Sequence, residues 1–289
     1  MKLLLLLLPL SLFANLNIAV SYPYIGAIVK SIGAEKINTQ VLADGNWDPH
    51  FIVPRPSLIS KVRNADGLIM NGAQLEIGWL PPLIRRAGNP KINMNAKTFL
   101  NLSNYIALVN KPQSVDRSGG DLHPQGNPHF HLDPNNILIL AAVIKEYLSS
   151  IDYDNAEIYE NNYQLFIKEW KEKIKVWKKK MLDKKGLKLI QFHNNMAYFI
   201  KAYSLKNIGT IEPLPGVPPS SRHTLKLIRL IKKDKPSCIL HDVYHSTKTA
   251  KYISAKTGIP VIIVPHDIKS LDSIDDLTSL FDYLTDVIK

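Results

Sequence analysis

The feature that most limits how this chain can fold is a regular alternation of short apolar segments and longer amphipathic segments, which occurs twice along the sequence. The short segments have strand character, and the longer ones carry apolar residues at helical spacing. Such alternation is typical of parallel sheets covered by helices. We therefore expect strands at 16–21, 39–42, 66–70 and 105–109 in the first run, and at 187–192, 208–211, 237–240 and 260–264 in the second. The expected helices are 24–32, 56–64, 75–87 and 136–148, then 196–203, 224–232, 247–256 and 273–288.

A single long helix is predicted between the two runs. Apolar and aromatic residues recur at spacings of three or four from Tyr159 to Met181, which places them on one face of a helix. Asp154 and Glu157 have the spacing of a capping box, and Gly186 marks an end. A helix of about thirty residues would be roughly 45 Å long, so we expect a rigid connecting rod and not a core element.

The predicted fold class is therefore α/β, with two lobes that each contain a parallel β-sheet flanked by helices, joined by one long rigid α-helix. The expected boundaries are an N-terminal lobe at 15–152, the linking helix at 153–185 and a C-terminal lobe at 186–289.

The N-terminus has the pattern of a secretory signal peptide. Lys2 precedes an apolar run that ends in Ala14, and this run is too short to span a membrane. We expect cleavage after Ala14, a periplasmic location and no lipid-anchor cysteine, because the residue directly after the proposed cut is not a cysteine.

The one cysteine, Cys238, is expected to be a buried strand thiol. An exported chain with a single cysteine has neither an internal disulfide nor a thiolate zinc cage, so any metal must bind through imidazole and carboxylate.

The formal net charge is +11, and much of the excess lies between residues 168 and 188. The simplest interpretation is one solvated helix face, and the alternative is contact with anionic lipid headgroups or an acidic partner. Nucleic acid is not expected as a partner, because the chain has no recognised binding motif.

Two histidines lie on loops constrained by proline, in the segments Asp48-Pro49-His50 and Asn127-Pro128-His129. Proline fixes its own φ and restricts the residue before it, so these imidazoles should be held in place before a ligand arrives. His193 and His266 follow the predicted strands 187–192 and 260–264. Ligands of open α/β sheets bind beyond the carboxyl ends of the strands, so we expect a metal site in the cleft between the lobes. Four imidazoles suit Zn²⁺ in tetrahedral geometry.

Several further residues could support or supplement this site. Asp133, Glu212, Asp267 and His131 could hold the imidazoles or replace one of them, and Asp121 and His123 could form a short capture loop. An ion held entirely by protein leaves no position for an activated water, so no catalysed reaction is expected. The competing class is a zinc hydrolase with three histidines and Glu212 as the base.

The chain resembles the periplasmic solute-binding proteins of zinc and manganese ABC transporters over nearly its whole length after the signal peptide. The resemblance rests on the residues around His50 and His129, the segment 71–76, the long helix and the proline-rich loop 212–219, which is similar to that of a zinc-type subgroup. It implies that His50, His129 and His193 are metal ligands. The usual fourth ligand in the family is an aspartate near the last strand. Here the alignment places His266 at that position, with Asp267 as the alternative. The long histidine-rich loop of many zinc members is absent.

The histidine pattern and the family resemblance together predict high-affinity capture of zinc by a monomer, followed by delivery to an ABC permease. Manganese or iron is the alternative cargo, and either would favour carboxylates over a fourth imidazole.

Overall fold

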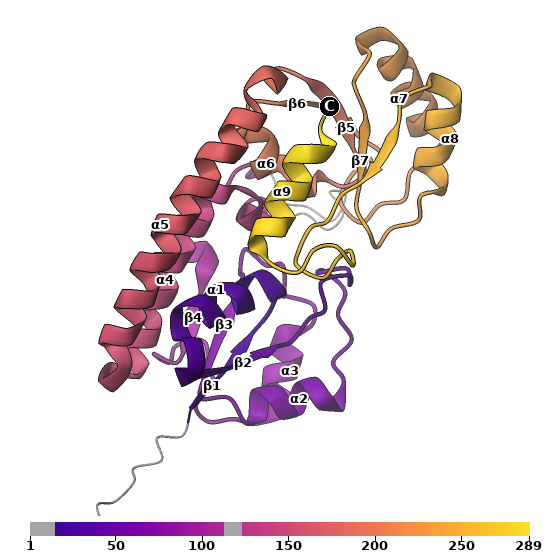
Figure 1. Ribbon diagram of the computed structural model, residues 1–289. Helices are drawn as coiled ribbons and strands as arrows, with labels where there is room; N and C mark the ends of the chain where they lie inside the picture. Colours follow the sequence, from indigo (N-terminus) through magenta and orange to yellow (C-terminus); the bar gives the residue numbers. More distant parts are fainter. Residues whose placement is uncertain (1–14, 113–122) are drawn as a thin grey trace, which may run out of the picture.

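The computed structural model describes residues 15–112 and 123–289, which form two four-stranded parallel sheets with helices around them (Figure 1). The predicted signal peptide and Asp121 lie outside the described residues. Within the described part of the chain, no helix is both long enough and apolar enough to cross a membrane.

The first sheet has the strand order β2-β1-β3-β4. Its interior is apolar, because Ile18, Val20 and Ile69 are fully buried. The strands are β1 (Leu16–Val20), β2 (Ile37–Val41), β3 (Gly67–Met70) and β4 (Phe99–Asn101), and the helices of this half are α1 (Pro23–Gly33), α2 (Pro56–Arg63), α3 (Leu80–Ala87) and α4 (Pro134–Ile151).

The second sheet repeats this arrangement in the order β6-β5-β7-β8, so its strands follow the same sequential pattern as those of the first. The strands are β5 (Lys188–Gln191), β6 (Lys206–Thr210), β7 (Ile239–His241) and β8 (Val261–Ile263), and the helices are α6 (Ala197–Ala202), α7 (Ser221–Asp234), α8 (Lys248–Thr257) and α9 (Leu277–Val287). The predicted α/β class and the pair of parallel sheets are confirmed.

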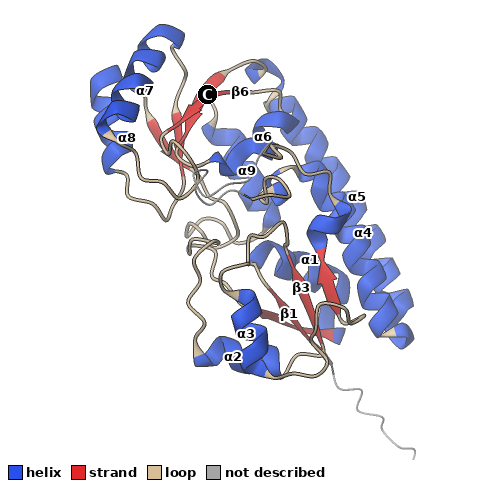
Figure 2. Ribbon diagram, turned by 180° about the vertical axis from the view of Figure 1, so that it is seen from behind, coloured by secondary structure: helices blue, strands red, loops and turns tan. Residues whose placement is uncertain are grey.

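The long helix is α5 (Ala156–Lys180), which lies beside α4 and contacts both α1 and α9 (Figures 1 and 2). Trp170 and Trp177 are buried, and their rings lie 5.6 and 5.1 Å from the ring of Phe281 in α9. The prediction of a rod that is not part of the core was therefore wrong, because the aromatic face of α5 completes the core. The predicted capping box was also wrong: the helix begins after Asn155, which makes no side-chain cap.

Two other sequence predictions need correction. The fourth strand is β4 at Phe99–Asn101 and not the apolar segment 105–109. The predicted helix 75–87 forms only from Leu80, as α3. Pro81 and Pro82 explain this start, because proline is tolerated in the first turn of a helix, where its missing N–H leaves no hydrogen bond unmade.

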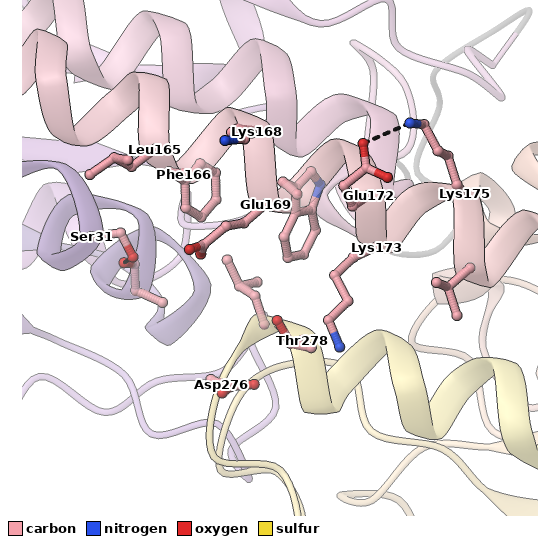
Figure 3. A pocket seen from close by; sticks show the side chains of 14 residues that line it. Ser31, Leu165, Phe166, Lys168, Glu169, Glu172, Lys173, Lys175, Asp276 and Thr278 are labelled. Atoms are coloured by element: carbon pink, nitrogen blue, oxygen red, sulfur yellow. Dashed lines mark hydrogen bonds and ion pairs between the residues drawn. The ribbon is translucent and has the colours of Figure 1, made fainter.

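A groove of about 770 Å³ lies between α1, α5 and the start of α9 (Figure 3). Its walls include part of the lysine-rich segment 168–188, and some of the lysines in this segment have acidic neighbours. Lys175 pairs with Glu172 at 2.6 Å, and Lys173 lies 3.7 Å from Asp282. The groove contains no histidine, so it is separate from the predicted metal site.

Candidate metal centre

Three of the predicted ligands, His50, His129 and His193, come together in one cluster. One ligand atom from each lies within 4.8 Å of the others. The ring centroids are 5.4 Å apart for His50 and His129, 5.2 Å for His50 and His193, and 5.5 Å for His129 and His193. The three imidazoles therefore surround a common point.

Each imidazole is presented by a loop near the carboxyl end of a strand or the start of a helix. His50 lies on the loop between β2 and α2, His129 lies just before α4, and His193 follows β5. The first loop is held by Tyr22, whose hydroxyl donates to the carbonyl of Pro49 at 2.8 Å. The backbone N–H of His129 donates to the side-chain oxygen of Asn127 at 2.9 Å. The site thus combines loops from both sheets.

Two carboxylates hold the imidazoles from behind. Asp48 Oδ1 accepts from Nδ1 of His50 at 2.8 Å, and Glu212 Oε2 accepts from Nδ1 of His193 at 2.7 Å. A carboxylate fixes the proton on Nδ1 and leaves the Nε2 lone pair for a metal. Burial raises the pKa of Asp48, but the hydrogen bonds from His50 and its charge outweigh burial and lower that pKa overall. Glu212 was predicted from the sequence as a supporting residue, whereas Asp48 was not, although it lies two residues before His50 in the segment Asp48-Pro49-His50.

His129 provides the clearest indication of an ion. Both of its ring nitrogens are buried without a hydrogen-bond partner, and such unsatisfied groups cost about 1–3 kcal/mol each. Burial, followed by the neighbouring His50 and His193, holds the pKa of His129 well below its ordinary value. The ring is therefore neutral and can donate a lone pair to a cation.

The two residues predicted as alternative fourth ligands lie outside the cluster of three. The ring of His266 packs edge-on against Tyr244 at 4.9 Å, and burial lowers the pKa of His266 to about 3. Asp267 accepts from the backbone N–H of Ile268 at 2.7 Å. Burial raises the pKa of Asp267 well above its ordinary value, which favours the protonated carboxyl.

The remaining predicted residues have separate surroundings. His131 stacks on Tyr24 at 4.3 Å, and its Nε2 donates to the carbonyl of His266 at 2.7 Å, so it ties the segment before α4 to the loop after β8. Asp133 caps α4 by accepting from the backbone N–H of Asn135 at 2.8 Å. His123 lies against His50, with ring centroids 5.3 Å apart.

Glu212 does not have the surroundings of a general base. One of its oxygens accepts from His193, and the other lies 3.8 Å from Nε2 of His245. His245 in turn contacts Asp242 at 2.9 Å. A base must reach the proton it removes, whereas this carboxylate orients an imidazole, so the hydrolase alternative loses its main support.

Comparison with known proteins identifies the family. Residues 18–289 match the model of the family described as zinc-uptake complex component A, periplasmic (ZnuA). This chain belongs to that family. A crystal structure of a ZnuA deletion mutant with zinc bound has 25% sequence identity and a TM-score of 0.79, and the match covers 94% of this chain and 96% of that one.

Among curated relatives, the manganese ABC transporter substrate-binding lipoprotein ScaA of Streptococcus gordonii is 26% identical over 86% of this chain and 78% of its own length. The zinc-binding lipoprotein AdcA of Streptococcus pneumoniae strain R6 is 22% identical over 85% of this chain, which spans about half of that relative (48%). Membership of the ZnuA family makes this chain a metal-capturing, non-enzymatic component of an ABC import system.

Proposed function

We propose that this chain captures Zn²⁺ in the periplasm, as a monomer, and delivers it to an ABC permease. The proposed ligands are His50, His129 and His193. The observation that carries the proposal is the cluster itself: three imidazoles face one point, and carboxylates fix the Nδ1 proton on two of them.

Zinc is favoured over manganese by the type of donor atom. Imidazole nitrogen suits Zn²⁺, whereas Mn²⁺ prefers carboxylate, carbonyl and water oxygen. Asp48 and Glu212 hydrogen-bond to the imidazoles, so they act as supports for nitrogen ligands. Relatives named for zinc and for manganese have similar sequence identity to this chain, so sequence identity does not distinguish the two metals. The preference for zinc is therefore argued from the nitrogen ligands alone.

The test is a pair of competition titrations with Zn²⁺ and Mn²⁺ on the purified chain, together with metal analysis of anaerobically handled protein. We expect one zinc per chain and a large preference for zinc over manganese. Equal affinity for the two metals, or zinc binding by His129→Ala that matches the parent, would contradict the proposal.

Export and the division into lobes belong to the same proposal. The chain is processed after Ala14, and residues 15–152 and 186–289 act as two lobes on either side of the helix segment 153–185. N-terminal sequencing of the protein from the producing cell tests the processing. Calorimetric unfolding tests the division, because two lobes should unfold in two transitions, and a single cooperative transition would contradict it.

A further inference from the structure

Three imidazoles leave one position of a tetrahedral zinc site open. His123 and His266 are the two candidates for this position, and their surroundings differ. Among the described residues, His123 is the histidine outside the cluster whose ring lies against a ring of the cluster. Its centroid lies 5.3 Å from that of His50, close to the 5.2–5.5 Å that separate the three clustered rings.

We propose that His123 supplies the fourth imidazole and thereby sets the preference for zinc. Its Nε2 is buried and has no hydrogen-bond partner. In a half-buried side chain such a nitrogen is costly unless a ligand uses it. The proposal rests on the proposed zinc function and names the residue that completes the same site.

The cluster also leaves room for this ring to move. A cavity of about 80 Å³ beside the site is lined by His123, His129 and His193. His123 is not one of the three residues whose ligand atoms lie within 4.8 Å of one another, so its side chain must rotate to reach the ion. The adjoining cavity provides space on the side of the ring that faces His129 and His193.

His266 is the competitor that the sequence predicted. Its Nδ1 is also buried without a partner, but its ring lies against Tyr244. Its backbone is tied to His131 through the 2.7 Å hydrogen bond from that imidazole. Turning the His266 side chain toward the cluster would break the ring contact with Tyr244, and the bond to His131 holds the backbone of His266 in place. Within residues 15–112 and 123–289, the side chain of His123 makes no hydrogen bond that such a movement would break.

The experiment counts imidazoles around zinc by X-ray absorption spectroscopy on the purified chain and on the variants His123→Ala and His266→Ala, each loaded with one equivalent of Zn²⁺. We expect four imidazoles in the parent, three plus one oxygen in His123→Ala, and four in His266→Ala. The zinc dissociation constant of His123→Ala should rise by at least the roughly tenfold that follows loss of a group supporting a ligand, and that of His266→Ala should stay near the parent value.

The outcomes separate this inference from the proposed function. Four imidazoles in His123→Ala and three in His266→Ala would overturn the inference and assign the fourth position to His266. Three imidazoles in the parent would also overturn it, while zinc capture would stand. A parent that binds no zinc would overturn both.

Discussion

The support that Glu212 gives to His193 provides the sharpest test of how the site holds its metal. The substitution Glu212→Gln retains the size of the side chain and an acceptor oxygen for the Nδ1 proton, which lies 2.7 Å away in the parent. It removes only the negative charge. Both side chains are 7% exposed, so water screens the lost charge poorly.

The magnitude follows from the geometry. The carboxylate lies one imidazole ring away from the ion, a separation of roughly 7 Å when the Zn–N bond is about 2.0–2.1 Å. At an effective dielectric constant of about 20, a unit charge and a +2 ion at that separation interact by roughly 5 kcal/mol. This value is an upper limit, because the retained acceptor and the surrounding dipoles replace part of it. Loss of a hydrogen-bond partner to a metal ligand typically weakens binding about 10–100-fold, which corresponds to about 1.4–2.7 kcal/mol.

The assay is a zinc titration against a chelator of known affinity, at one pH, with apo-protein melting curves recorded in parallel. Asp133→Asn is the matched control. It makes the same carboxylate-to-amide change, but Asp133 caps α4, and asparagine caps a helix about as well as aspartate. We expect Glu212→Gln to bind zinc 10–100-fold more weakly and the control to bind like the parent. Parental affinity in Glu212→Gln would refute the role assigned to this carboxylate.

Four further predictions follow from the same structure. His129→Leu should abolish zinc binding in a titration and leave the melting temperature of the apo-protein unchanged or higher, since it removes buried nitrogens without partners. A lower melting temperature of the apo-protein would contradict this. Between pH 7 and 5, zinc affinity should fall by less than the roughly ten-thousandfold expected for three imidazoles of pKa about 6.5. The reason is that the pKa of His129 lies well below its ordinary value, so protons compete less at this ligand than at an ordinary imidazole. Titrations at three pH values measure the fall, and a fall of roughly the full ten-thousandfold would contradict the reasoning. His123→Asp should lower the zinc-to-manganese affinity ratio because it adds an oxygen donor, whereas His266→Asp should leave the ratio near that of the parent; competition titrations decide between them. Gly45→Ala should lower the free energy of unfolding by about 1–3 kcal/mol, because its Cβ would overlap a backbone oxygen in the loop after β8. Gly78→Ala is its control, since the new Cβ has its nearest neighbour at 3.7 Å, and equal denaturation midpoints for the two variants would contradict the steric argument.

The sequence revealed most of the fold because alternating strands and helices are local patterns. It placed seven of the eight strands close to their observed positions. The eighth, β4, is only three residues long, too short to show any periodicity, and the apolar segment 105–109 competed with it. The late start of α3 could have been predicted from Pro81 and Pro82 alone. The core role of α5 could not, because it depends on the packing of α9 against the aromatic face of that helix.

At the site, the sequence revealed the features that depend on neighbouring residues, and it did not reveal contacts between distant parts of the chain. His50 and His129 were recognisable from their prolines, and Asp48 lies two residues from the imidazole it holds. The sequence did not indicate that His123 lies close to His50, because 72 residues stand between the two in the chain. The same holds for the hydrogen bond from His131 to the carbonyl of His266, which joins segments of the two halves of the chain.

The division of the site between two halves limits how metal binding can change the molecule. The donor atoms of the three histidines already lie within 4.8 Å of one another, whereas tetrahedral zinc with Zn–N of about 2.0–2.1 Å needs nitrogens about 3.4 Å apart. The remaining contraction is therefore at most on the order of 1 Å, which loop and side-chain adjustment can supply. α5 opposes a larger movement, because it is fixed at both ends. Asn162 donates to the carbonyl of Ile32 at the end of α1 at 2.9 Å, and Trp177 donates to Asp282 of α9 at 2.8 Å. A helix held in this way favours capture by local tightening of the histidine loops over rotation of one half against the other.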